Sequence, residues 1–234
     1  MSDAAFSIGP PTLLSVQVGL PQTLGGAARP WTTGFIKAAV AGPVQLGPTN
    51  LVGDGQADLA NHGGPDKAVC VYPAVHYPHW RAELGLPLTH GAFGENFTAG
   101  GWSEADVCVG DVWAIGGALV QVSQPRQPCW KLARRWDVKD LALRVQQTGR
   151  TGWYFRVLRA GGVEAGGAFA LAERPEPVWT VSRANEVMHH RKADLALAAE
   201  LAAVSCLSAS WRSNLRDRVE KGVPPDTSKR LTGP

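Results

Sequence analysis

The sequence has no long apolar run, no strong charge surplus and no N-terminal pattern typical of a signal peptide. No apolar stretch in its 234 residues approaches the roughly 20 that a membrane-spanning helix needs. The 23 Lys and Arg residues nearly balance the 20 Asp and Glu, and their scatter gives no nucleic-acid footprint. The N-terminal residues carry no basic region ahead of their apolar ones, unlike a signal peptide. We therefore expect a cytoplasmic protein that binds neither membranes nor nucleic acids.

Several catalytic signatures are missing as well. The sequence contains no GxSxG elbow, no HExxH zinc motif, no GxxxxGK[ST] phosphate loop and no GxGxxG ahead of a helix. Their absence disfavours the hydrolases, zinc proteases, nucleotide hydrolases and dinucleotide-binding enzymes that depend on them. The four cysteines, at positions 70, 108, 129 and 206, form no CxxC pair, which predicts free thiols.

Glycine and proline, by contrast, are abundant, because 27 Gly and 17 Pro make up 44 of the 234 residues. Between them lie short runs rich in β-branched and aromatic residues, which predict strands at 13–20, 35–40, 68–72, 112–116, 118–123, 154–158 and 169–173. Gly116-Gly117 separates two runs as a tight hairpin does, and Gly161-Gly162 and Gly166-Gly167 look similar. The pattern predicts a mainly β fold with helices, closed or nearly closed into a barrel.

Helical periodicity is expected in two places within the strand-rich region and in most of the C-terminal part. Residues 75–84 and 131–148 have apolar stripes, and Asp137 and Lys139-Asp140 mark a division of the second. From 182 to 221 the chain has no glycine, and three helices are expected, capped by Thr180 or Ser182 and ended by Gly222.

These patterns divide the chain into three parts. We expect a β-barrel domain over residues 1–180, a small helical module over 181–223 and a flexible tail over 224–234. The module is too small to bury much core alone, so it should pack on the barrel or on a second subunit. The pair His189-His190 has no neighbouring carboxylate or cysteine cluster and is interpreted as a solvated helix end.

Two polar loops are candidates for binding. The segment NHGGPDKA at 61–68 combines two glycines, whose backbone N–H groups can cradle an anion, with His62, Asp66 and Lys67. A tight, solvated turn is an equally good reading of the same residues. In GAFGENF, at 91–97, Asn96 could reach into a pocket, but a role in a turn is the simpler reading.

The segment SQPRQPCWK at 123–131 is the third candidate. Two prolines fix its backbone, and Cys129 falls at the start of a predicted helix, where the helix N-terminus, Arg126 and Lys131 favour the thiolate. Such a thiolate could act as a nucleophile or as a ligand of a soft metal, and a small buried thiol is the alternative. The other three cysteines lie in apolar surroundings and are interpreted as core residues.

Four ordered motifs resemble the MOSC domain family, which takes its name from the C-terminal domain of molybdenum cofactor sulfurase. They are NHGGPDKAVCVYP at 61–73, GAFGENF at 91–97, VGDVWAIGGALVQVSQPRQPCWKL at 109–132 and TGRTGWYFRVL at 148–158. Their order and spacing resemble the small stand-alone bacterial members of the YiiM type, which are associated with resistance to hydroxylaminopurine. The helical segment containing LSASW, at 207–211, resembles the C-terminal extension of that subgroup.

The resemblance implies a MOSC-type β-barrel that binds the molybdenum cofactor, Mo-molybdopterin. Cys129 would be the catalytic residue and the protein ligand of the metal. The implied cofactor-binding residues are His62, Gly63, Gly64, Asp66, Lys67, Asn96, Gln124 and Arg126. We expect the loop 62–67, Asn96 and the segment 126–129 to converge on one positively charged cleft, with the Cys129 sulfur partly accessible.

The implied activity is that of an oxidoreductase that reduces small N-hydroxylated compounds, such as hydroxylaminopurine-type bases, to amines. The chain has no flavin, haem or iron–sulfur motif, so its electrons would come from a separate reductase. One alternative is a carrier of cofactor or sulfur that uses Cys129 as a persulfide site, without reductase activity. Another is an interaction protein that uses the barrel only as a scaffold.

Overall fold

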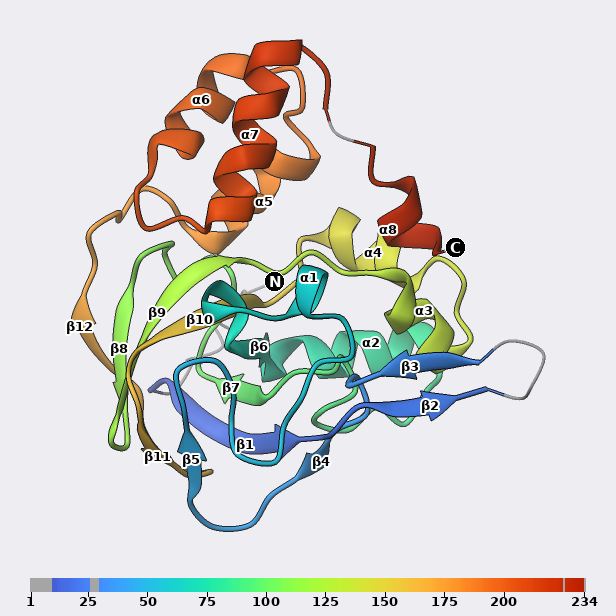
Figure 1. The fold of residues 1–234 in the computed structure, drawn as a ribbon, viewed down its shortest axis with the longest axis vertical. Helices are drawn as coiled ribbons and strands as arrows, with labels where there is room; N and C mark the ends of the chain where they lie inside the picture. Colours follow the sequence, from blue (N-terminus) through green and yellow to red (C-terminus); the bar gives the residue numbers. More distant parts are fainter. Residues whose placement is uncertain (1–9, 26–29, 225, 234) are drawn as a thin grey trace, which may run out of the picture.

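A computed structural model describes residues 10–25, 30–224 and 226–233 (Figure 1). Residues 1–9, on which the argument against a signal peptide rests, lie outside the described residues. The strands are β1 (Thr12–Val18), β2 (Gln22–Leu24), β3 (Trp31–Thr33), β4 (Ala38–Ala39), β5 (Val44–Leu46), β6 (Val69–Pro73), β7 (Phe97–Gly100), β8 (Val112–Ile115), β9 (Ala118–Pro125), β10 (Trp153–Arg159), β11 (Gly161–Val163) and β12 (Ala170–Glu173). The helices are α1 (Leu59–His62), η1 (Pro65–Lys67), η2 (Ala74–His76), α2 (Tyr77–Leu84), α3 (Trp130–Trp136), α4 (Leu141–Thr148), α5 (Val181–His189), α6 (Leu195–Ala203), α7 (Ala209–Lys221) and α8 (Ser228–Thr232).

The main sheet is strongly curved and forms an incomplete barrel. Its strands follow the order β12-β8-β9-β10-β6-β7-β1-β4, and only the β6–β7 pair within it is parallel. The ends of the sheet approach each other, since Thr12 of β1 bridges Ala168 and the amide of Leu13 donates to the Gly167 carbonyl at 2.8 Å. The expected mainly β, barrel-like fold with a C-terminal helical module is therefore confirmed.

Aromatic side chains fill the inside of the curved sheet. Trp102 contacts Trp113 and Phe169 with ring centroids 4.5 and 4.6 Å apart, and Trp153 at 5.9 Å. All four residues are buried. Contacts of this kind add roughly 0.5–1.5 kcal/mol per pair beyond the burial of apolar area. The core is thus dense at the centre of the sheet, and the functional loops lie at its margin.

The expected strands are present, with one short exception, but two of the three expected hairpins are wrong. No hairpin forms at Gly166-Gly167, because β12 pairs with β8 and not with β11. The run at 35–40 yields only β4, which pairs with the end of β1. Gly116, at φ +54°, makes the expected hairpin turn between β8 and β9. The hairpin expected at Gly161-Gly162 is wrong, because both glycines lie inside β11, which pairs with β5. A Cβ on Gly161 would collide with the backbone of Gly117, so the glycine permits a close approach of two segments.

The helical segment 131–148 is divided as expected. Asp137, at φ +54°, ends α3 in the left-handed conformation, and Gly149, at φ +69°, ends α4 in the same way. Of the two proposed caps for α5, Thr180 is the one used, since its hydroxyl accepts the amide of Arg183 at 3.0 Å. Gly222 ends α7 with a left-handed residue.

The helices α5, α6 and α7 form a module that sits on one end of the sheet, beside β8, β9 and β10 (Figure 1). Val109 of the barrel domain belongs to the same apolar cluster as Trp179, Leu201 and Trp211. The interpretation of His189 as a solvated helix end is wrong, because this side chain is only 8% exposed and packs edge-on against Trp211. The helical period shows that one face of α5 is apolar but not that the last turn also meets α7.

The C-terminal residues expected to be a flexible tail contain the short helix α8. This helix lies beside α3 and α4, away from the three-helix module (Figure 1). Pro225 and Pro234 lie outside the described residues. The four cysteines are free thiols, as predicted. Across the described ranges, no helix is both long and apolar enough to cross a membrane.

Candidate functional site

A cleft opens where several loops meet the strands β6 and β10. It is lined by Thr33, Gly34, Phe35 and Lys37 after β3, by Gly55 to Asp58 and His62 around α1, by Lys67, Cys70, Gly94, Asn96 and Tyr154, and by Arg126, Gln127, Cys129 and Lys131 around the start of α3. The expected convergence of the glycine loop, the Asn96 loop and the cysteine segment is therefore observed. Four residues that were expected to bind the cofactor are not among the described residues that line the cleft: Gly63, Gly64, Asp66 and Gln124.

Cys129 occupies the N-cap position of α3, in an extended backbone conformation. The helix begins there because Pro125 and Pro128 keep the preceding backbone out of the helical range. The side chain lines the cleft but is only 8% exposed, which is less accessible than expected. Its sulfur lies 3.4 Å from Nε2 of His62, within hydrogen-bond distance for sulfur. The thiol and the imidazole thus form a pair at the base of the cleft.

His62 is held in its neutral form. Burial and the positive charge of Lys131 lower the pKa of His62 to about 4, and Asp58, which lies 3.6 Å from Nδ1, only partly opposes this. At neutral pH the ring therefore carries one N–H group and one acceptor nitrogen. Nδ1 is buried and has no hydrogen-bond partner among the described residues. The ring can therefore donate a hydrogen bond to the Cys129 sulfur, or accept one from it, without adding a charge to the cleft.

The cleft is rich in positive charge. Lys37, Lys67, Arg126 and Lys131 line it, against a single lining carboxylate, Asp58. Lys37 is neutralised by an ion pair with buried Asp54. The net positive potential can therefore concentrate an anionic ligand although the whole chain is only +3.

Arg126 is the most unusual of these cations. It is 5% exposed, its Nη1 has no hydrogen-bond partner, and no ion pair is found for it among the described residues. Burial alone would lower the pKa of Arg126, but its neighbours Cys70, Tyr154 and Cys129 raise it, so the guanidinium remains charged. A buried charge without a partner is costly, and a bound anion would satisfy it. The donor set thus fits a ligand that carries a phosphate or a similar anion.

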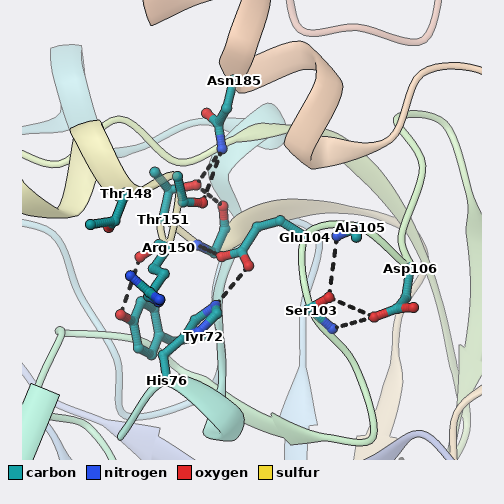
Figure 2. Close-up of polar contacts among 12 residues, drawn as sticks. Tyr72, His76, Ser103, Glu104, Ala105, Asp106, Thr148, Arg150, Thr151 and Asn185 are labelled. Atoms are coloured by element: carbon teal, nitrogen blue, oxygen red, sulfur yellow. Dashed lines mark hydrogen bonds and ion pairs between the residues drawn. The ribbon is translucent and has the colours of Figure 1, made fainter. Parts of the chain in front are cut away.

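A buried polar network holds the backbone of Arg126 in place. The amide of Arg126 donates to the Gly152 carbonyl at 3.0 Å, and the Gly152 amide donates to Oε1 of Glu104 at 2.7 Å. The other oxygen of Glu104 lies 2.7 Å from Nε2 of His76. Figure 2 draws this contact as a dashed line. Gly152 has φ +70°, and a Cβ there would collide with the Val71 carbonyl oxygen, which explains the glycine in TGRTGW.

The same network reaches the helical module. Nδ2 of Asn185, in α5, donates to Oγ1 of Thr151 at 2.8 Å (Figure 2). The amide of Ser182 donates to the backbone carbonyl of Glu104 at 2.8 Å. Sequence reasoning missed Glu104 and His76, and no spacing in the sequence links them to Arg126. The first turn of α5 is thereby bonded to the elements that support the cleft.

Asp66 and Gln124 face the helical module. Oδ1 of Asp66 forms an ion pair with Arg156 at 2.7 Å, and Oδ2 accepts the amide of Ala209, the first residue of α7, at 3.1 Å. Oε1 of Gln124 accepts the hydroxyl of Ser210 at 3.3 Å. Both side chains therefore connect cleft-forming segments to the LSASW segment. Gly64, at φ +89°, lies next to them and allows the turn into η1.

The amide of Asn96 is fully engaged within the protein. Its Oδ1 accepts the amide of Cys70 at 3.0 Å, and its Nδ2 donates to Asp54 at 2.9 Å and to the Gln17 carbonyl at 3.3 Å. Asn96 thus orients the carboxylate that pairs with Lys37. Cys70, interpreted from the sequence as a core residue, is buried but also lines the cleft. Strand alternation could have predicted that Cys70 and Tyr154 face away from the core, because their strand neighbours Val69 and Phe155 face into it. Lys37 and Asp54 lie outside such strands, and no sequence pattern places them in the cleft.

The cleft offers few protein ligands for a metal. In the part of the chain that the structure describes, no group of three or more His, Cys, Asp and Glu side chains could hold a metal ion. Cys129 could therefore serve a metal only as one ligand of a centre whose other ligands come from elsewhere. A thiolate next to several cations fits a soft or high-valent metal that an anionic organic chelator carries into the cleft.

Comparisons with known proteins agree with this architecture. Residues 58–170 match the family model described as MOSC domain, and residues 179–222 match the YiiM-like, 3-alpha helix domain. The protein YiiM of Escherichia coli is 39% identical over 200 residues, which cover 84% of this chain and 89% of that protein. A Gibberella moniliformis protein named Reductase is 38% identical over 204 residues, which cover 85% of this chain but 36% of the fungal protein. The crystal structure of YiiM from Geobacillus stearothermophilus has a TM-score of 0.78 at 41% identity and covers 90% of this chain and all of that one.

Proposed function

This chain belongs to the MOSC domain family, and from that premise we propose that its cleft binds the molybdenum cofactor and reduces small N-hydroxylated compounds to amines. Hydroxylaminopurine-type bases are the substrate class we favour. The observation that carries the proposal is the buried guanidinium of Arg126, with its unpartnered Nη1, in the same cleft as the thiol of Cys129. A cation and a soft ligand together suit an anionic cofactor that contains a metal.

The residues of the cleft divide into two roles. Lys67, Arg126 and Lys131 would hold the anionic groups of the cofactor, and Cys129 would provide a thiolate ligand to the metal. When bound, the cofactor supplies the two-electron chemistry by which an N–OH group and two protons become N–H and water. The protein contributes the pre-arranged charges, which need no reorganisation during the reaction.

His62 and Tyr154 are the neutral hydrogen-bonding groups of this site. The Nε2 atom of neutral His62 can donate a hydrogen bond to the Cys129 sulfur and so orient it. Burial and the nearby Cys70 raise the pKa of Tyr154, so its phenol stays protonated and can donate a hydrogen bond in the cleft. Neither group brings a negative charge that would oppose an anionic ligand.

We propose that a separate reductase delivers the electrons. The fungal relative bears the name Reductase, and most of its length lies outside the segment that it shares with this chain. The shared segment of this chain contains no flavin, haem or iron–sulfur motif, so its electrons would come from a partner. The free thiols agree with the expected cytoplasmic setting.

Metal analysis tests the proposal directly. The protein is purified from a host that synthesises the cofactor, and molybdenum, cyanolysable sulfur and reduction of an N-hydroxylated base by a chemical electron donor are measured. We expect molybdenum stoichiometric with the chain and activity at background in Cys129→Ser with little change in thermal stability. Cys206→Ser should lose stability, because its hydroxyl enters apolar surroundings, while activity per folded molecule is retained. Arg126→Met should lose molybdenum while remaining folded.

The alternatives give different results. Cyanolysable sulfur on Cys129 without molybdenum would favour the sulfur carrier. Full activity in Cys129→Ser would refute both the metal-ligand and the persulfide roles. Loss of activity together with unfolding in that variant would indicate a buried structural thiol.

A further inference from the structure

The C-terminal segment Asp226–Gly233 folds back onto the turn that carries Cys129. In Figure 1, α8 lies beside α3 and α4, although its position in the chain follows the distant three-helix module. None of the segment's residues lines the cleft. The family comparisons match residues 58–170 and 179–222 and so leave this segment unassigned.

Arg230 makes the central contacts of the segment. Its Nη1 donates to the backbone carbonyl of Pro128, and its Nη2 donates to Oε1 of Gln146 in α4 at 2.6 Å. One guanidinium thereby joins the residue before Cys129 to a separate helix. Hydrogen bonds from a charged donor are stronger than neutral ones, and the planar fork fixes their direction.

A second contact lies on the other side of Cys129. Gly233 packs so closely on the indole of Trp130 that a Cβ at this glycine would lie 3.0 Å from Cγ of the ring. The segment therefore touches both sequence neighbours of Cys129, Pro128 through a hydrogen bond and Trp130 through packing. Contacts on both flanks restrict the turn more than either contact alone.

The fold of the segment depends on this docking. Its helix has only five residues, and a helix of that length is not stable alone in water. Local help comes from Asp226, which accepts the amide and the hydroxyl of Ser228. The order of the segment and the position of the cysteine turn are therefore coupled.

We infer that Asp226–Gly233 is a strap that holds the turn Pro128–Trp130, and that Arg230 is a positioning residue for the Cys129 thiol. Arg230 acts from outside the cleft, through its hydrogen bond to the Pro128 carbonyl. Two residues earlier in the chain, the Arg126 amide is held by the Gly152 carbonyl. The inference concerns the thiol itself and holds whether or not the proposed cofactor chemistry is correct.

Alkylation of the thiols tests the strap. The full chain is treated with iodoacetamide, and the alkylation rate of each cysteine is measured by peptide mass spectrometry. The pH is chosen high enough that raising it further no longer increases the rate at Cys129. Differences in thiolate fraction then do not contribute. Preparations of equal molybdenum content are compared, since a bound metal would protect the thiol. Cys206, which is partly exposed and lies between α6 and α7 in the helical module, is the internal reference.

In Arg230→Gln, and in a chain that ends at residue 224, Cys129 should react roughly tenfold faster, the factor expected when a charge-assisted hydrogen bond is lost. Arg230→Lys keeps the charge but not the fork and should give an intermediate rate. The matched control is Arg216→Gln, because Arg216 is an exposed arginine on α7. In this variant the alkylation rate of Cys129 should equal that of the natural protein.

Two results would overturn the inference. One is an unchanged Cys129 rate in both Arg230→Gln and the shortened chain. The other is an equal acceleration of Cys129 and Cys206, which would indicate general loosening and no specific hold on the turn. Both results are measured at matched molybdenum content and neither uses reductase activity, so a failure of the strap is distinguishable from a failure of the proposed function.

Discussion

The substitution Glu104→Gln isolates the buried carboxylate that supports the cleft. Glu104 accepts the Gly152 amide with one oxygen and pairs with His76 through the other, both at 2.7 Å and both shielded from water. Gln keeps the shape and one acceptor oxygen but removes the charge. It therefore tests the ionic character of the network without leaving a cavity.

The expected cost follows from burial. Glu104 accepts two buried hydrogen bonds, and weakening the bonds to a charged, buried acceptor costs about 2–3 kcal/mol. For a chain of this size that loss corresponds to a fall in Tm of roughly 4–12 °C. The matched control is Glu83→Gln, since Glu83 also pairs with a histidine, His79, at 2.9 Å, but in a solvent-exposed position. Its loss should be about 0.2–1 kcal/mol.

Urea unfolding and molybdenum retention are measured for both variants. Because Gly152 anchors the Arg126 amide, Glu104→Gln should also lose more cofactor than Leu201→Ala, a variant of comparable instability in the remote helix α6. If Glu104→Gln were no less stable than Glu83→Gln, the buried pair would not be a structural clamp. If its cofactor loss matched that of Leu201→Ala, the link from Glu104 to Arg126 would be wrong.

Two further predictions concern pH and the glycine loop. Burial and nearby Arg230 lower the pKa of His189 from 6.5 to about 3, so the unfolded chain binds a proton that the folded chain does not, and stability falls as pH drops below 6.5. The unfolding free energy should decrease between pH 6.5 and 5 by about 1.4 kcal/mol per pH unit from this residue, and His189→Leu should remove that contribution; an unchanged slope in urea titrations would contradict the assignment. Asp66→Asn should weaken the bond to Arg156 and α7 and cost about 1 kcal/mol with molybdenum retained, whereas loss of molybdenum at unchanged stability would place Asp66 in the cofactor site.

The sequence alone was sufficient for features that depend on neighbouring residues. Alternating apolar residues between glycines and prolines predicted the strands, and Asp137 and Gly149 marked the ends of α3 and α4 correctly. The family and the convergence of His62, Arg126 and Cys129 were predicted differently, from the resemblance of four ordered motifs to known proteins. The strand pattern and the helix ends can be predicted from the sequence because backbone conformation, capping and turn formation are decided within a few residues.

Only the tertiary structure decided which partner each polar side chain meets. Asp66 and Gln124 belong to the correct loops, yet both turn toward α7, 143 and 86 residues away in their hydrogen-bonded pairs. Glu104 supports Arg126 through Gly152, and His189 is buried although it ends a helix. The expected flexible tail carries α8, whose Arg230 reaches Pro128. Sequence periodicity shows which face of an element is apolar but not which distant element covers it, and these contacts exist only once the sheet has curled and the helices have docked.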